Sequence, residues 1–284
     1  MTTTVSRLKR RMKESLRAAI AGGARLFVKI VPFRVAVILK EHLDLTEKLD
    51  YDKHDIFLSI HSSIEHAIRV HSCKREPETI DWLECSLRGG DVLFDIGANV
   101  GAYSLVAAKF SRGEARIYAF EPAFSSFAAL CRNIAINHCD GCIVPLNLVL
   151  SDETSIGAFH YSDTRSGSSL HSYGINRNCK GQLFTPAMKQ PVLSYRLDDL
   201  VRIFPIPVPN LMKIDVDGIE LAILQGAVQT FKDQRLRGVL VEIEPESMHR
   251  GEICDFMALH GFRLLPASKQ GVANAIFSRQ THDA

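Results

Sequence analysis

From Asp91 onward the chain alternates between short apolar runs and segments with helical spacing. The apolar runs are rich in β-branched and aromatic residues and predict strands at 92–95, 115–120, 143–150, 211–215 and 238–243. Segments with apolar residues at the helical period lie between them, at 101–110, 125–137 and 218–232. Strands that alternate with helices form parallel sheets with right-handed crossovers. We therefore predict an α/β fold with a doubly wound, mostly parallel sheet.

The last part of the chain predicts an antiparallel edge to this sheet. A helix is expected at 250–260, followed by strands at 262–266 and 273–278. Only a few residues, among them Gly271, separate the two strands, so they should pair as a hairpin. Residues 51–90 form a lead-in, whose last helix begins near Pro77 and ends before Gly89.

The first 40 residues differ in charge from the rest. They carry ten Lys or Arg against Glu14 alone, so this head has a net charge of +9 and the remainder −7. Arg25, Lys29 and Arg34 interrupt its apolar segment well before the roughly 20 apolar residues that a membrane span needs. We predict a helical extension over 1–50, the lead-in over 51–90 and a catalytic domain over 91–284. The extension either packs on the rest of the chain or contacts an anionic membrane peripherally.

Composition limits the class of protein. Hydrophobic residues make up 46% of the chain and charged residues 23%, which is typical of soluble globular proteins. The seven cysteines show no framework spacing, which indicates a reducing compartment and favours the cytoplasm. Nucleic acid is disfavoured as a partner because the body is acidic, and the IDVDG stretch lacks the Asn/Asp-Pro-Pro-aromatic signature of exocyclic amine methylation. The sequence predicts no oligomeric state.

The stretch VLFDIGANVG predicts a ligand site at the end of the first strand. It delivers Asp95 to the carboxyl end of that strand, where open α/β sheets bind ligands. Gly97 permits a tight turn, Asn99 places a polar group at the rim, and Gly101 lets the following helix lie close to the strand. In the plainer alternative, Asp95 only caps this helix.

The second strand adds a carboxylate beside that turn. Glu121 closes YAFEP 26 positions after Asp95, where it can accept hydrogen bonds from both hydroxyls of a ribose. The Gly97-x-x-x-Gly101 spacing lacks the G-x-G-x-x-G pattern of dinucleotide sites. Two carboxylates at one rim favour a positively charged ligand. We therefore predict a nucleoside with a cationic tail.

Four motifs in order resemble the FkbM-type branch of class I S-adenosylmethionine-dependent methyltransferases. They are DIGANVG, FEP, MKIDVDGIELAILQGA and VLVEIEP, and the similarity runs from about Glu76 to the C-terminus. The resemblance implies a Rossmann-like seven-stranded sheet, S-adenosylmethionine as cofactor, and methylation of a hydroxyl on a sugar, glycan or natural product. By position, it implies that the methionine end contacts Asp95, Gly97, Asn99 and Gly101, that Glu121 holds the ribose, and that Ser151 and Asp152 flank the adenine.

Acidic residues at the ends of the fourth and fifth strands are the catalytic candidates. An alcohol is a weak nucleophile, so a base or a metal near the hydroxyl would help. Asp215 ends the fourth strand and Glu242 lies near the end of the fifth, and we predict both as catalytic. With Asp217 they could also hold a divalent cation, but no metal ligand is predicted. Asp217 alternatively caps the next helix.

The polar segment 162–190 is long for a loop inside a compact domain, which suggests a task. Its SGSSL stretch resembles one in FkbM-type enzymes, and we predict that Ser168, Ser169 and His171 contact the substrate. A disordered insert is the alternative. Two other functions stay open: a nucleotide-dependent oxidoreductase on a similar sheet, and a non-catalytic, membrane-associated scaffold.

Overall fold

The computed structural model describes residues 2–177, 182–243, 247, 249–266 and 273–280, and for residues 2–11, 13 and 14 it describes the backbone only. The chain divides into two compact units, Met1–Leu45 and Thr46–Ala284. The first unit holds α1 (Thr2–Ile30) and α2 (Phe33–Glu41). Pro32 lies between them and has no N–H with which to continue the helical hydrogen bonds. Within the described residues, no helix has the length and apolar character needed to span a bilayer.

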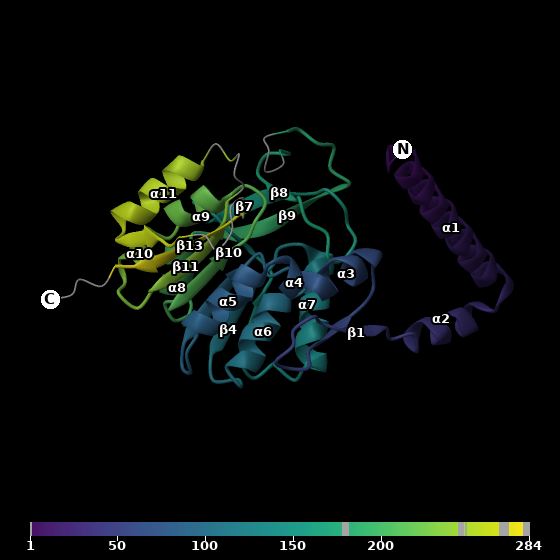
Figure 1. The fold of residues 1–284 in the computed structure, drawn as a ribbon, viewed down its shortest axis with the longest axis horizontal. Helices are drawn as coiled ribbons and strands as arrows, with labels where there is room; N and C mark the ends of the chain where they lie inside the picture. Colours follow the sequence, from purple (N-terminus) through teal and green to yellow (C-terminus); the bar gives the residue numbers. More distant parts are fainter. Residues whose placement is uncertain (1, 178–181, 244–246, 248, 267–272, 281–284) are drawn as a thin grey trace. The chain divides into compact units, whose positions relative to one another are not determined.

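A seven-stranded sheet forms the centre of the second unit (Figure 1). Its strand order is β12-β13-β11-β10-β3-β4-β5. The strands are β3 (Val92–Ile96), β4 (Arg116–Phe120), β5 (Ile143–Leu146), β10 (Leu211–Ile214), β11 (Gly238–Glu242), β12 (Phe262–Leu264) and β13 (Asn274–Arg279). Neighbours pair in parallel except at β13, which is antiparallel to β11 and β12. The predicted doubly wound sheet and its antiparallel C-terminal edge are confirmed.

Both faces of this sheet are covered, because successive residues of each strand point to opposite sides. Leu93 belongs to one apolar cluster and Phe94 to the other, as do Leu211 and Met212. The first cluster contains residues of α5 (Pro77–Ser86), α6 (Ala102–Phe110) and α7 (Phe124–Ile136). The second contains residues of α8 (Leu197–Ile203), α9 (Glu220–Gln225), α10 (Val228–Lys232) and α11 (Arg250–Leu259). The helix predicted over 218–232 is thus two helices.

The lead-in is a packed part of the second unit. Together with residues 46–50, which were predicted as part of the helical extension, it holds an antiparallel pair, β1 (Thr46–Lys48) and β2 (Phe57–Ser59), and then α3 (Ser63–Ala67), a 3₁₀ turn η1 (Arg69–His71) and α4 (Ser72–Arg75). Amide oxygens of Asn133 and Asn137 on α7 accept hydrogen bonds from the backbone of β2. Leu49, Ile56 and Leu58 are buried in the first apolar cluster. The lead-in therefore supports one wall of the unit rather than linking two domains.

A second, smaller sheet was not predicted from the sequence. Its order is β6-β9-β7-β8, with β6 (Val149–Leu150), β7 (Ser155–Tyr161), β8 (Ser172–Tyr173) and β9 (Met188–Tyr195). The single strand predicted at 143–150 is wrong, because the chain leaves the large sheet after Leu146 and Val149 pairs with Ser194 instead. The Asn147 amide donates to the carbonyls of Glu121 and Pro122 at this departure. Part of the predicted 162–190 loop also joins this sheet, as β8 and the start of β9.

Candidate functional site

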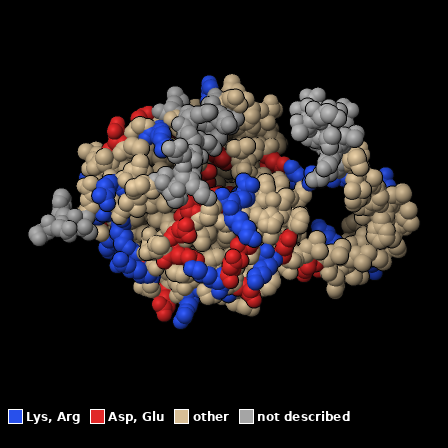
Figure 2. Space-filling model, in the orientation of Figure 1, with Lys and Arg blue, Asp and Glu red and all other residues tan. Residues whose placement is uncertain are grey.

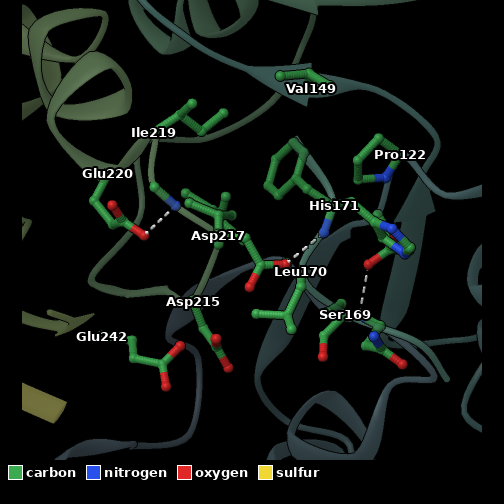
Figure 3. A pocket seen from close by; sticks show the side chains of 18 of the residues that line it. Pro122, Val149, Ser169, Leu170, His171, Asp215, Asp217, Ile219, Glu220 and Glu242 are labelled. Atoms are coloured by element: carbon green, nitrogen blue, oxygen red, sulfur yellow. Dashed lines mark hydrogen bonds between the residues drawn. The ribbon is translucent and has the colours of Figure 1, made fainter. Parts of the chain in front are cut away.

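A cavity of about 300 Å³ lies at the carboxyl ends of β3, β4, β10 and β11 (Figure 3). Four segments supply most of its wall. They are η1 with α4, the turn between β3 and α6, the residues after β10, and residues 168–173. Parallel strands deliver their carboxyl ends to one edge, which is why segments far apart in sequence meet here. We call residues 162–172 the strap, because they cross this cavity between β7 and β8.

The turn after β3 can form only with glycine at its first bend. Gly97 has φ of +83°, and a Cβ there would lie 1.9 Å from the Asp215 carbonyl oxygen. Gly101 also has a positive φ, of +86°. Asn99 has φ of +51°, in the left-handed region that asparagine tolerates better than most residues. At Gly97 the turn after β3 therefore packs against the residues that follow β10. These two segments form a continuous rim of the cavity.

Glu121 holds this turn from the end of β4. Its carboxylate accepts hydrogen bonds from the backbone N–H groups of Asn99 (2.8 Å) and Ala123 (2.7 Å). Burial of the side chain raises the pKa of Glu121 to about 7, although those hydrogen bonds favour the charged form. Each oxygen keeps lone pairs for further donors. A ligand with neighbouring hydroxyl groups would therefore find two acceptors here.

Asn99 connects the turn to the strap. Its Nδ2 donates to the Ser168 carbonyl over 2.8 Å. Its Oδ1 is buried and has no hydrogen-bond partner among the described residues. Buried polar atoms are nearly always hydrogen-bonded in folded proteins, so an orphaned acceptor in a cavity wall is a place for a ligand donor.

Four predicted cofactor contacts, Asp95, Gly101, Ser151 and Asp152, do not line the cavity. Asp95 is buried beneath the turn, where it accepts from Ser104 Oγ over 2.6 Å, and burial raises the pKa of its carboxyl group. Ser151 and Asp152 lie beyond the wall that Leu148, Val149 and Leu150 form, and Ser151 Oγ donates to Asp152 Oδ1. In contrast, Gly97, Asn99 and Glu121 line the cavity, while Gly101 lies between the lining residues Val100 and Ala102.

The carboxyl edge of β10 holds a buried charge network that includes a residue missed in the sequence. Lys213 is 1% exposed, and its Nζ donates to Asp215 Oδ2 over 2.6 Å and lies 3.9 Å from Asp95 Oδ1. It also lies 4.8 Å from the ring centre of Tyr103, a cation–π contact. Burial disfavours the charged ammonium, but the two carboxylates outweigh this effect and raise the pKa of Lys213. Lys213 therefore remains charged.

Asp215 and Glu242 line the cavity together, as Figure 3 shows. Burial opposes ionisation of Asp215, but Lys213 overcomes it and lowers the pKa of Asp215 to about 2. Burial and then the Asp215 charge raise the pKa of Glu242 far above its usual range. These opposite shifts favour a pair that shares one proton at neutral pH, because Lys213 stabilises the charge on Asp215 and that charge opposes ionisation of Glu242. The Asp215 side chain is 27% exposed, so a bound ligand can reach it.

Two more carboxyl groups with raised pKa follow β10. Asp217 Oδ2 accepts from the His171 backbone N–H over 3.1 Å, and burial followed by the Asp215 charge raises its pKa to about 7. Glu220 accepts from the Gly218 N–H, and burial raises its pKa to about 8. The α9 helix begins at Glu220 with Ile219 as its cap. The alternative that Asp217 caps this helix is therefore wrong, since its carboxylate accepts a hydrogen bond from the strap instead.

The strap is ordered and anchored to the lead-in, so the alternative of a disordered insert is wrong for this part of the segment. Glu65 Oε1 accepts from Ser166 Oγ over 2.6 Å, and Ser62 Oγ donates to the Ser166 carbonyl over 2.6 Å. Arg69 Nε donates to the Gly167 carbonyl over 2.8 Å. These anchors place Ser168, Ser169 and His171 in the cavity wall.

The ring of His171 braces the strap. It lies 5.5 Å from the Phe159 ring and 5.2 Å from the Tyr161 ring, between centroids. Its Nδ1 accepts from the Ser162 N–H, which leaves the proton of the neutral ring on Nε2, 3.2 Å from Ser168 Oγ. Burial lowers the pKa of His171 to about 4, so the ring is neutral at physiological pH.

The cavity wall is acidic overall. Its carboxyl groups outnumber its two guanidinium groups, those of Arg69 and Arg75, and belong to Glu76, Glu121, Asp215, Asp217, Glu220 and Glu242. Such a wall attracts cationic ligands where its carboxyl groups are ionised, and the raised pKa values of Glu121, Asp217, Glu220 and Glu242 reduce its negative charge at neutral pH. In the part of the chain that the structure describes, no group of three or more His, Cys, Asp or Glu side chains could hold a metal ion.

A sheet of this strand order, with an antiparallel strand beside its edge and a cavity at the carboxyl ends, is a Rossmann-like α/β fold with a ligand site at its usual edge. Residues 95–264 match the family model described as the methyltransferase FkbM domain. The chain belongs to this family.

Named relatives and solved structures are similar to this chain. The hexuronic acid methyltransferase AglP of Haloferax volcanii is 27% identical over 181 residues, 64% of this chain and 67% of that protein. The 31-O-demethyl-FK506 methyltransferase FkbM of Streptomyces tacrolimicus is 30% identical over 198 residues, 63% of this chain and 75% of that protein. The solved structure of M. jannaschii TYW2 in complex with AdoMet shares 11% identity, with a TM-score of 0.42, and covers 84% of this chain and 88% of that one.

Proposed function

We propose that the protein is an S-adenosylmethionine-dependent O-methyltransferase that acts on a hydroxyl group of a sugar, glycan or natural product. The acidic cavity at the carboxyl edge, with Glu121 and the orphaned Asn99 Oδ1 on its donor side, is the observation that carries this proposal. Family membership supports it. The names of two relatives support the acceptor class, since one refers to a hexuronic acid and the other to an O-demethylated compound.

The cavity wall fits the proposed cofactor. Its volume of about 300 Å³ lies at the lower end of the range for small-molecule sites. Gly97, Asn99 and Gly101 would hold the amino-acid end, while Glu121 would accept from the ribose hydroxyl groups. Asp95 is buried and does not line the cavity, so it would affect a bound cofactor only through its electrostatic field. When bound, S-adenosylmethionine supplies a methyl group on a sulfonium, which is already a good leaving group.

Residues at the carboxyl ends of β10 and β11 would act on the acceptor. Methyl transfer requires the attacking oxygen to lie in line with the bond that breaks, so positioning supplies much of the rate. We assign this positioning to Asp215, which is ionised and can accept a hydrogen bond from the acceptor hydroxyl, and to Glu242, which can donate one. We assign removal of the hydroxyl proton to Asp217, because a base is most efficient when its pKa lies near the working pH.

Calorimetry with S-adenosylhomocysteine, the demethylated product, tests the donor half of the proposal. The wild type should bind it, Glu121→Gln should bind it about tenfold or more weakly because a charged acceptor is lost, and the exposed control Glu114→Gln should bind it unchanged. A wild type that binds nicotinamide dinucleotides and not this compound would revive the oxidoreductase alternative, which no feature of the cavity favours.

Mass spectrometry tests the acceptor half. The wild type is offered S-adenosylmethionine with alkyl glycosides of hexuronic acids, neutral glycosides and macrolide alcohols. Methyl groups should appear on oxygen in at least one class, and Asp217→Asn should abolish most of the transfer. Transfer to nitrogen would contradict the proposal, and so would strong cofactor binding without transfer to any acceptor, as expected of a scaffold.

A further inference from the structure

We infer that the first unit, residues 1–45, binds the surface of an anionic lipid bilayer. Lipid binding by this unit is independent of the proposed function. Helix α1 carries the large apolar side chains Met12, Leu16, Ile20, Phe27 and Ile30, which are between 48% and 72% exposed. At the helical rotation of about 100° per residue, these five positions fall within a stripe about 80° wide, while the exposed Leu26 and Val28 lie about 40° and 80° beyond its two edges. One continuous face of α1 is therefore apolar.

The opposite face is basic. Arg17, Arg25 and Lys29 fall outside the apolar stripe, between about 60° and 140° from its nearest edge. The sequence adds further positive charge toward the N-terminus, with Glu14 as the only acidic residue among the first 40. An apolar stripe with Lys and Arg on the other face is typical of helices that lie in a membrane interface, and the positive charge selects anionic lipids.

The exposed apolar surface of the described residues is concentrated in this unit. Of the 26 exposed large apolar side chains that they hold, 14 lie between Met12 and Leu45. No residue of α2 is buried, although Phe33, Val37 and Ile38 are apolar. Figure 2 shows the described atoms of this unit mostly in tan, the colour of residues other than Lys, Arg, Asp and Glu. Contiguous apolar surface of this kind marks an interaction site, and lipid matches both its apolar and its basic faces.

Flotation of the full chain with vesicles tests the inference. Vesicles of phosphatidylcholine with phosphatidylglycerol should carry the protein upward, and vesicles of phosphatidylcholine alone should carry much less. Binding should weaken in high salt because the charges are screened. Replacing Arg17, Arg25 and Lys29 together by Gln should weaken binding to anionic vesicles by roughly 100-fold.

A matched pair of variants separates apolar insertion from charge attraction. Leu16→Gln with Phe27→Gln alters the apolar stripe and should weaken vesicle binding by roughly 100-fold. Ala18→Gln with Ala21→Gln places the same side chains on the other face and should bind as the wild type does. All variants should bind S-adenosylhomocysteine equally, because the cavity is lined by residues of the second unit.

Three results would overturn the inference. The first is a wild type that does not float with anionic vesicles. The second is equal loss of binding in the two glutamine pairs. The third is wild-type self-association, seen by light scattering and lost in Leu16→Gln with Phe27→Gln, without vesicle binding, since the stripe would then pack against a second copy of the chain. Unchanged binding of S-adenosylhomocysteine would keep each of these results separate from a failure of the proposed function.

Discussion

At the scale of single residues, the site depends on which acidic groups stay charged. Lys213 stabilises the charge on Asp215, and that charge opposes ionisation of Glu242. The sequence predicts Asp215 and Glu242 at the rim because parallel strands end at one edge. It does not indicate Lys213, since a lysine is rarely buried, and this one is buried only because β10 lies between β3 and β11 in the finished sheet.

Removing the Lys213 charge should destabilise the fold. Lys213→Met would leave the buried Asp95 and the partly exposed Asp215 without their counter-charge, at a cost of about 3 kcal/mol. Urea denaturation measures the free energy of unfolding, and the exposed Lys189→Met serves as the control. Equal stability of the two variants would show that the ammonium group does not compensate these carboxylates.

Activity should rise with pH as Asp217 loses its proton. Its raised pKa places the rise near pH 7, because only the charged carboxylate can accept the hydroxyl proton. Asp217→Asn keeps an oxygen for the His171 N–H, yet should lower kcat by about 100-fold and remove the rise. Rate profiles of both proteins against pH provide the measurement. A rise that persists in Asp217→Asn would assign the base to another group.

At the scale of elements, the strap and the small sheet show where sequence patterns fail. Residues 162–190 are polar, and their composition predicts a loop. The order of the strap within this segment comes from partners far away in the chain, such as Glu65, which accepts from Ser166. The prediction of one strand at 143–150 is wrong for the same reason, because its two halves belong to different sheets. Periodicity locates a strand in the sequence but does not show which strand pairs with it. The large sheet could be predicted because strands and helices alternate locally along the chain.

Loosening the anchor of the strap should mobilise it. Ser166→Ala removes the donor to the buried Glu65 Oε1 and should cost about 1 kcal/mol. Hydrogen exchange should speed up in residues 162–172, and the KM for the acceptor should rise more than that for the cofactor. Thr185→Ala, at an exposed position, should change neither. Unchanged exchange in Ser166→Ala would mean that Arg69 and Asn99 hold the strap without Glu65.

At the scale of the whole molecule, the acidic cavity links stability to pH. The folded protein raises the pKa of Glu121 and Asp217 to about 7 and that of Glu220 to about 8. These groups hold protons in the folded state at pH values where the unfolded chain has released them, so stability falls as pH rises through the folded values. His171 has the opposite effect on stability, because its folded pKa is lowered from 6.5 to about 4. Its contribution makes stability rise with pH between these two values and changes little above them.

The free energy of unfolding of the ligand-free protein should therefore decrease between about pH 6.5 and pH 8. Urea titrations across that range measure it. Glu121→Gln should flatten the decrease by on the order of 1 kcal/mol, because the amide does not ionise. A stability that rises over this range would show that these carboxyl groups are already ionised in the folded state.

The small sheet also has a consequence for how such enzymes diversify. Val149 pairs with Ser194, so the excursion through β7, β8 and the strap leaves and re-enters the body at adjacent points. An insertion whose two ends are adjacent can change in length and sequence without moving the turn that would bind the methyl donor. On the proposed function, changes in this insertion would alter which acceptor is bound without altering the segment that binds the cofactor.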